Sequence, residues 1–98
     1  MIVEHALLDV RAGHESEFES VFATAKAIIA ASSGFRSLRL LRGIESPSRF
    51  LLIVEWDTLE DHTVGFRSSD AYQEWRRLLH HFYDPFPVVE HYSVVETA

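Results

Sequence analysis

The sequence contains no cysteine, which excludes disulfide bonds, thiolate nucleophiles and cysteine-based metal sites. This absence fits a reducing compartment, and we expect a cytoplasmic protein. Only one lysine, Lys26, accompanies eight arginines, and the formal net charge is −6. No basic run is present to attract a phosphate backbone, so we expect no nucleic-acid partner.

Long apolar runs are also missing. No stretch approaches the about 20 apolar residues that a membrane-spanning helix requires, so we expect no membrane association. The first apolar stretch is interrupted by Glu4, His5 and Asp9, so we expect no signal peptide.

Hydrophobic residues are abundant throughout the chain. They make up 47% of the 98 residues, and twelve residues are Phe, Tyr or Trp. This length suits one domain, and we expect residues 1–98 to form it. So small a domain buries a modest share of its surface, which predicts that self-association covers the remaining apolar area.

Hydrophobic periodicity predicts four strands and two main helical regions. Apolar residues at helical spacing follow Glu15, and the run before Trp56 is almost unbroken, as in a strand covered on both sides. The expected elements are a strand over 2–10, a helix from 15 to Gly34, strands over 35–43 and 49–56, a short helix after Thr58, a helix from Asp70 to Phe82 and a strand over 88–97.

Four local signals mark the boundaries of these elements. Gly34 is expected to cap the first helix in the left-handed conformation. Thr58 and Asp61 have the spacing of a capping box, and Ser68-Ser69-Asp70 indicates a break and a new N-cap. Asp84-Pro85-Phe86-Pro87 is a rigid stop before the last strand.

The element order is β-α-β-β-α-β, which predicts an α+β fold of the ferredoxin-like, split β-α-β type. The expected four-stranded antiparallel sheet has the order 4-1-3-2, with both helices on one face. Because the strands are apolar on both faces, we expect a second copy to cover the open face. The predicted assembly is a homodimer through the sheet face, a dimeric α+β barrel.

The chain also resembles a known family over nearly its whole length. The shared segments are Arg11–Glu15, Ser33–Phe35, Phe50–Trp56 followed by Asp57–His62, Phe66–Ser69, and Trp75-Arg76. In these segments it is similar to the antibiotic biosynthesis monooxygenase domains. The resemblance implies a cofactor-independent monooxygenase or oxidase acting on a small aromatic or quinone-like substrate.

Three positions are assigned roles by this resemblance. Trp56 matches a pocket-lining tryptophan, His62 stands where the family has a tyrosine, and Arg76 matches an arginine. Leu52 replaces an asparagine, which removes an amide partner for a substrate oxygen. The residues that the haem-degrading branch needs are absent near Ala6 and Trp75, so we expect no haem and no other cofactor.

Three of the six histidines are candidates for a site. His5 and His91 lie on strands expected to be neighbours, and His62 lies one turn into the short helix. We expect them to approach one cavity, and a metal site, hydrogen-bonded neutral imidazoles and surface positions all remain open. His62 is the candidate general base because its ordinary pKa is near 6.5.

Arg76 is the candidate stabiliser of a substrate anion because its charge is permanent. The alternative for Arg76 is an ion pair with Glu74 or Asp70 on a solvated face. The aromatic candidates either line a flat substrate slot or belong to the core. They are Trp56, Phe66, Tyr72, Trp75 and Phe82.

Charged residues on the strands leave two further possibilities open. Glu4, Glu55 and Glu90 either pair with Arg39 and Arg42 across the dimer, or one carboxylate has a raised pKa and acts as a base. The alternative to an enzyme is a non-catalytic dimeric module that binds a small molecule or serves a stress response.

Overall fold

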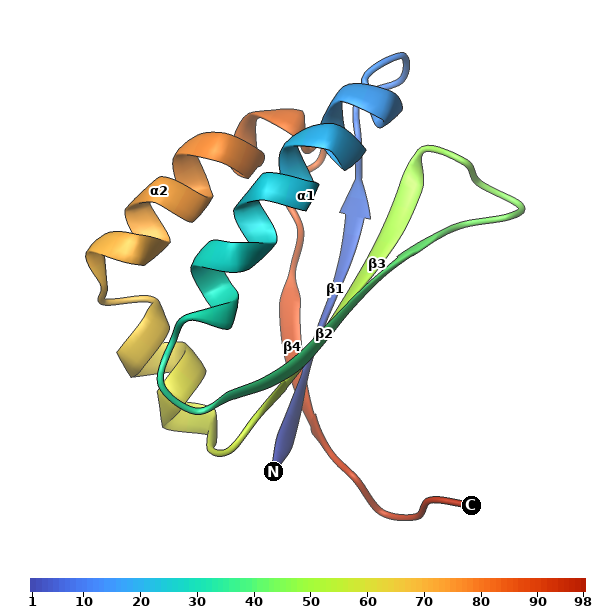
Figure 1. The fold of residues 1–98 in the computed structure, drawn as a ribbon. Coiled ribbons are helices and arrows are strands. Elements are labelled where there is room, and N and C mark those ends of the chain that lie inside the picture. The colour runs from blue at the N-terminus through green and yellow to red at the C-terminus, as the bar shows by residue number, and fades with distance from the viewer.

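A four-stranded antiparallel sheet carries two helices on one face (Figure 1). The computed structural model describes all 98 residues. The elements are β1 (Ile2–Asp9), α1 (Glu15–Ala30), β2 (Phe35–Arg42), β3 (Arg49–Trp56), η1 (Asp61–Phe66), α2 (Asp70–Leu79), η2 (His80–Phe82) and β4 (Val89–Ser93).

The strand order is β2-β3-β1-β4, which confirms the predicted order read from the opposite edge. The central strands β1 and β3 pair from Ile2 opposite Trp56 to Asp9 opposite Arg49. On the other side of β1, Glu4 lies directly opposite His91 of β4. Residues directly opposite one another point to the same face, so these two side chains are neighbours on the helical side.

The core lies between the sheet and the helices. The apolar stripe of α1 buries Phe18, Phe22, Ala25 and Ile29, because residues at this spacing share one side of a helix. The Phe18 ring centroid lies 5.0 Å from that of Phe50 on β3. The same stripe extends at its margin to Val21 and Ile28, which are half-buried.

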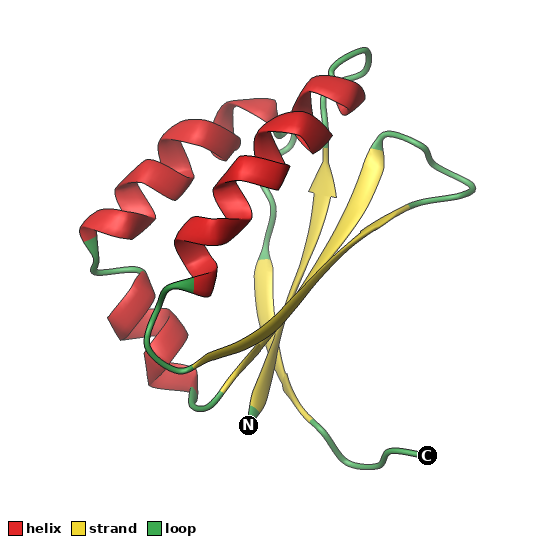
Figure 2. Cartoon of the chain, in the orientation of Figure 1, coloured by secondary structure: helices red, strands yellow, loops and turns green.

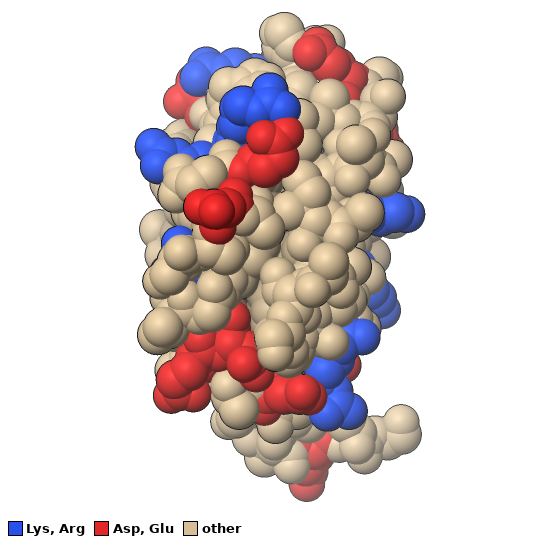
Figure 3. All heavy atoms as spheres, turned by 60° about the vertical axis from the view of Figure 1, so that its left-hand side comes forward, with Lys and Arg blue, Asp and Glu red and all other residues tan.

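All helical segments cover the same face, and the other face of the sheet carries none (Figure 2). Seen from the side of α2, acidic and basic side chains are interspersed around broad uncharged areas (Figure 3). None of the helices is both long enough and apolar enough to cross a membrane.

The boundary signals at η1 and α2 behave as predicted. Asp61 Oδ2 accepts a hydrogen bond from the Thr58 backbone at 3.2 Å, and Thr58 Oγ1 accepts one from the Asp61 backbone at 3.2 Å. The Ser69 side chain caps α2 by accepting from the Tyr72 backbone at 3.1 Å. The short helix η1 is a π-helix, a geometry that is frequent at functional sites.

Gly34 meets two requirements at once. Its φ of 82° lies in the left-handed region as predicted, but it does not cap α1, which ends at Ala30 with Ala31 as its C-cap. A Cβ atom at this position would also collide with the side chain of Asp61. The turn after α1 therefore packs directly against the start of η1.

Three predicted boundaries are wrong by a few residues. The first helix ends at Ala30 rather than at Gly34. The last strand ends at Ser93 rather than at residue 97 because Ser93 pairs with Ile2, and β1 offers no partner beyond that point. The regular helix α2 ends at Leu79, and the turn η2 continues the chain to Phe82.

Candidate functional site

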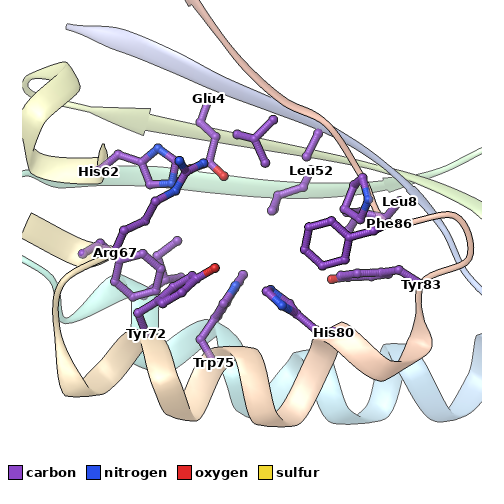
Figure 4. Close-up of a pocket in the computed structure, with 15 residues that line it drawn as sticks. Glu4, Leu8, Leu52, His62, Arg67, Tyr72, Trp75, His80, Tyr83 and Phe86 are labelled. Carbon is purple, nitrogen blue, oxygen red and sulfur yellow. The ribbon is translucent and has the colours of Figure 1, made fainter. Parts of the chain in front are cut away.

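A cavity of about 370 Å³ lies between the sheet and the α2 layer (Figure 4). Inward side chains of β1 and β3 form one wall, and residues from η1 to the start of β4 form the others. The lining residues are Glu4, Ala6, Leu8, Ile29, Leu52, His62, Phe66, Arg67, Tyr72, Trp75, His80, Tyr83, Phe86, Pro87 and Val89.

Glu4 is the acidic residue of this cavity. Strand alternation points it inward with Ala6 and Leu8, and its side chain is only 6% exposed. Trp56 Nε1 donates a hydrogen bond to Glu4 Oε1 at 3.0 Å. Burial raises the pKa of Glu4, while this hydrogen bond and the charge of Arg67 act in the opposite direction.

His62 connects Glu4 to the edge of the sheet. Its Nε2 lies 3.3 Å from Glu4 Oε1, and its Nδ1 lies 2.8 Å from His91 Nε2. Its ring stacks on Trp56 at 5.3 Å between centroids and 21° between planes. These contacts hold the imidazole on both sides and on one flat face.

Burial lowers the pKa of His62 to about 3, and the charges of Arg67 and His91 add to the effect. His62 is therefore neutral at neutral pH, and its 3.3 Å contact with the Glu4 carboxyl is not an ion pair with an imidazolium. Burial and Arg67 also lower the pKa of the half-buried His91.

No group of three or more side chains is arranged to hold a metal ion. The 2.8 Å contact between His62 and His91 is a hydrogen bond that occupies one ring nitrogen of each residue. The chemistry of this donor set fits proton transfer within a hydrogen-bonded chain.

Arg67 supplies the positive charge at the cavity. It directly follows η1, and its side chain reaches back toward His62 and Glu4 across from Tyr72 (Figure 4). The residue is exposed, so its guanidinium group reaches both solvent and the cavity. A substrate anion bound near His62 would meet this permanent charge.

The aromatic candidates are divided between the cavity and the core. Phe66, Tyr72 and Trp75 line the cavity. Trp56 is fully buried behind His62, so it supports the site through Glu4 instead of forming a wall. Phe82 packs in the core, with its ring centroid 5.5 Å from that of Phe18.

Arg76 does not lie at the cavity, so its expected role there is corrected. It follows the buried Trp75, and one helical step of about 100° turns it to the exposed side of α2. The alternative pairing with Glu74 is also wrong, because Arg77 forms that ion pair. Arg67 supplies the positive charge at the cavity that sequence reasoning expected from Arg76.

His5 is corrected for a similar reason. Its neighbour Glu4 points inward, so strand alternation places His5 on the helix-free face. There its ring makes an edge contact with Tyr92, with centroids 5.5 Å apart. Of the three histidines expected to converge, His62 and His91 meet and His5 does not.

Sequence reasoning missed Arg67, His80 and Tyr83. Arg67 lies within the Phe66–Ser69 segment shared with the family, so this resemblance could have indicated it. His80 and Tyr83 follow the end of the regular helix, so no helical spacing places them at the cavity. Burial and the Glu4 charge raise the pKa of the Tyr83 phenol, which keeps it neutral.

The ion pairs expected between charged strand residues were pairs across a dimer, and the single chain shows a different pairing for one of them. Arg42 pairs with Glu19 of α1 at 3.3 Å. Glu55 and Glu90 lie on the helix-free face, since they are paired with the outward-facing Val3 and His5. Glu4 alone among the three carboxylates is buried at the cavity.

The fold and cavity define a ferredoxin-like α+β domain with a polar cluster between its sheet and its second helix. The family model of the antibiotic biosynthesis monooxygenases matches residues 1–78, and the chain belongs to this family. The chain is 50% identical over 95 residues to the uncharacterized protein YczJ of Bacillus subtilis (strain 168), which covers 97% of this chain and all of that protein.

Solved structures agree with this assignment. A crystal structure from Bordetella bronchiseptica, assigned to the same monooxygenases, superposes with a TM-score of 0.92 at 37% identity and covers 97% of each chain. SnoaB, a cofactor-independent oxygenase from Streptomyces nogalater, superposes with a TM-score of 0.77 at 22% identity. That match covers 98% of this chain and 94% of SnoaB, and it is a likeness of fold.

Proposed function

We propose that the chain is a cofactor-independent monooxygenase or a related oxidase that acts on a small aromatic or quinone-like molecule. The observation that carries this proposal is one cavity combining a buried carboxyl–imidazole pair, a guanidinium group and aromatic walls. Its volume of about 370 Å³ is near the lower end for small-molecule sites, so the substrate is compact.

The proposed chemistry begins with proton removal from a phenol or quinol. The Glu4–His62 pair accepts the proton, and the charge of Arg67 stabilises the resulting anion. The anion then gives electrons to O₂. A monooxygenase inserts one oxygen atom and releases the other as water, whereas an oxidase forms the quinone and hydrogen peroxide. The substrate supplies all the electrons, so the proposal needs no cofactor.

Oxygen uptake with a panel of anthrones and quinols tests this function. We expect His62→Ala to lower kcat/KM by about 10² or more, as loss of an acid–base group does. Arg67→Gln should weaken turnover by about tenfold, which is about 1.4 kcal/mol of lost anion stabilisation. Arg77→Gln is the matched control because Arg77 is exposed on α2, where it pairs with Glu74, and should leave turnover unchanged.

The possible results distinguish a wrong role for His62 from the absence of the proposed activity. Equal turnover by wild type and His62→Ala would remove His62 from the mechanism. Absence of oxygen uptake by the wild type with every substrate would overturn the enzymatic proposal. Thermal unfolding of each variant shows whether a lost activity reflects lost folding.

A non-catalytic binding module is the second candidate, and Leu52 favours it. The resembling oxygenases carry an amide at this position, whereas Leu52 adds an apolar side chain to the cavity wall. Such a module would bind an anthrone or quinol in calorimetry without consuming oxygen. A stress-response role is one function that such a non-catalytic module would have.

A homodimer through the helix-free sheet face is proposed as the assembly. Paired residues place Leu41, Leu51 and Leu7 in one row across this face, and Val3 beside Tyr92 in another. In the single chain Leu7 is 44% exposed, Leu41 40% and Tyr92 49%. Packing two such faces together removes this apolar surface from water.

A further inference from the structure

We propose that Glu4, His62 and His91 form a proton relay between the cavity and the outer edge of the sheet, with Glu4 accepting the substrate proton. This inference rests on the proposed function, because it assigns the proton-accepting group and the exit route at the same site. It gives His91, which does not line the cavity, a part in the reaction.

The three side chains form an unbroken series of polar contacts. Glu4 Oε1 lies 3.3 Å from His62 Nε2, and His62 Nδ1 lies 2.8 Å from His91 Nε2. His62 has one ring nitrogen toward each neighbour, the arrangement that lets a ring accept a proton on one side and release one on the other. The series therefore has the connectivity of a proton path.

The two ends of the series lie in different environments. Glu4 lines the cavity with a side chain only 6% exposed, and His62 beside it is 4% exposed. His91 is half-buried on β4, which is an edge strand of the sheet. Glu4 and His91 face the same side because they are directly paired across β1 and β4. The path thus runs from a buried carboxyl group to a half-buried residue on the edge strand.

Trp56 holds the inner end of the relay without taking part in transfer. Its indole nitrogen is only a donor, so its 3.0 Å hydrogen bond to Glu4 stabilises the carboxylate form that can accept a proton. Its stacking on His62 also holds the imidazole plane beside the carboxyl group. Trp56 is therefore a positioning residue.

Proton transfer through the relay balances at each step. The substrate O–H bond breaks and an O–H bond forms on Glu4. In the tautomer that carries the proton on Nδ1 of both neutral imidazoles, Glu4 then gives its proton to His62 Nε2 while the proton on His62 Nδ1 moves to His91 Nε2. The proton on His91 Nδ1 leaves to water. A proton needed when O₂ is reduced returns by the reverse sequence, which restores the original hydrogen-bond direction.

The charges around the relay disfavour a protonated His62, so the proton does not remain on this residue. Arg67 is the cation that faces all three groups, and it acts with burial to disfavour a charged His62. The other titratable group that senses Glu4 is Tyr83, whose phenol stays neutral. His62 therefore transmits a proton without becoming a stable imidazolium.

Nitrogen NMR of the imidazole rings tests the connection in the absence of substrate. At neutral pH we expect His62 to be neutral, with an Nδ1 resonance that shifts as His91 titrates. His91→Ala should move this resonance, and His91→Gln should partly preserve it because the amide still hydrogen-bonds. A His62 Nδ1 resonance unchanged in His91→Ala would overturn the relay.

Chemical rescue tests the transfer itself. With an anthrone that the wild type oxidises, we expect His91→Ala and His91→Gln to be slower by about tenfold or more. Added imidazole should restore His91→Ala toward the wild-type rate, because a diffusing base replaces the lost shuttle. Wild type and the exposed control His14→Ala should not depend on imidazole concentration.

The two measurements separate the relay from the proposed function. A wild-type rate in His91→Ala, or a loss that imidazole does not restore, would overturn the relay while leaving the monooxygenase proposal intact. If no substrate is oxidised by the wild type, the proposed function fails and the NMR result decides whether the connected series exists.

Discussion

At the scale of single residues, the site depends on placing a carboxyl group where water is nearly absent. An isolated buried carboxylate is costly, and Glu4 is tolerated because Trp56 and His62 contact its oxygen. His62 in turn is buried in its neutral form, hydrogen-bonded to His91 through Nδ1 and in contact with Glu4 through Nε2. These two residues stabilise one another's position while their pKa values move in opposite directions.

Folding stability should depend on pH through His62. Its pKa falls from 6.5 to about 3 on folding, so below pH 6.5 the unfolded chain binds a proton that the folded chain rejects. Stability is therefore lost as pH falls from 6.5, with a limiting slope of about 1.4 kcal/mol per pH unit. Urea unfolding between pH 7 and pH 5 measures this slope.

His62→Phe is the comparison for this prediction, because it keeps an aromatic ring on Trp56 and removes the titrating group. The raised pKa of Glu4 acts in the opposite sense, since the folded state then binds more protons as pH falls. That contribution remains in the variant, so the wild type should lose more stability on acidification. Parallel pH profiles for the two proteins would contradict the prediction.

At the scale of elements, the segment from η1 to the start of α2 places most of the polar site. Its π-helical turn presents His62 and Phe66 inward, and Arg67 follows immediately at the rim. The capping box before η1 and the serine cap of α2 hold this segment at both ends. Local side-chain-to-backbone hydrogen bonds therefore set where the functional residues lie.

Removing the cap of α2 tests this dependence. Ser69→Ala takes away the acceptor for the Tyr72 backbone, and we expect a loss of about 0.5–2 kcal/mol in the free energy of unfolding. Ser68→Ala is the matched control, since Ser68 is exposed and does not cap the helix. Denaturant unfolding measures both variants, and equal stability would show that the cap contributes little.

At the scale of the whole molecule, one sheet face is covered by helices and the other is not. The uncovered face carries several half-exposed apolar residues on all four strands. Burial contributes about 25 cal/mol for each Å² of apolar surface, so pairing of two faces gives a substantial driving force. The same packing would cover His5 and Tyr92.

The proposed dimer predicts twice the 11.3 kDa chain mass in sedimentation at micromolar concentration. Leu7→Glu should shift the protein toward monomer, because it places a charge in the apolar row of the helix-free face. Val64→Glu is the control, since Val64 is 60% exposed on η1, on the opposite side of the sheet. A folded, monomeric wild type at this concentration would contradict the assembly.

The elements, their order and most of their ends follow from short-range patterns in the sequence. The stripe containing Phe18 and Phe22, the cap at Ser69 and the glycine at position 34 depend on neighbours within a few residues. Such short-range preferences do not depend on the tertiary fold. The split β-α-β order then restricts the sheet to few arrangements, and the observed strand order is the predicted one.

Which charged and polar side chains meet depends on how the elements pack and pair in the folded chain. Glu4 and His5 differ by one strand position and therefore face opposite sides of the sheet. Arg67 reaches the cavity and Arg76 does not, because one follows a π-helical turn at the rim and the other lies on the outer side of α2. The meeting of Glu4, His62 and His91 depends on the register that sets Glu4 opposite His91, which the predicted strand order does not specify.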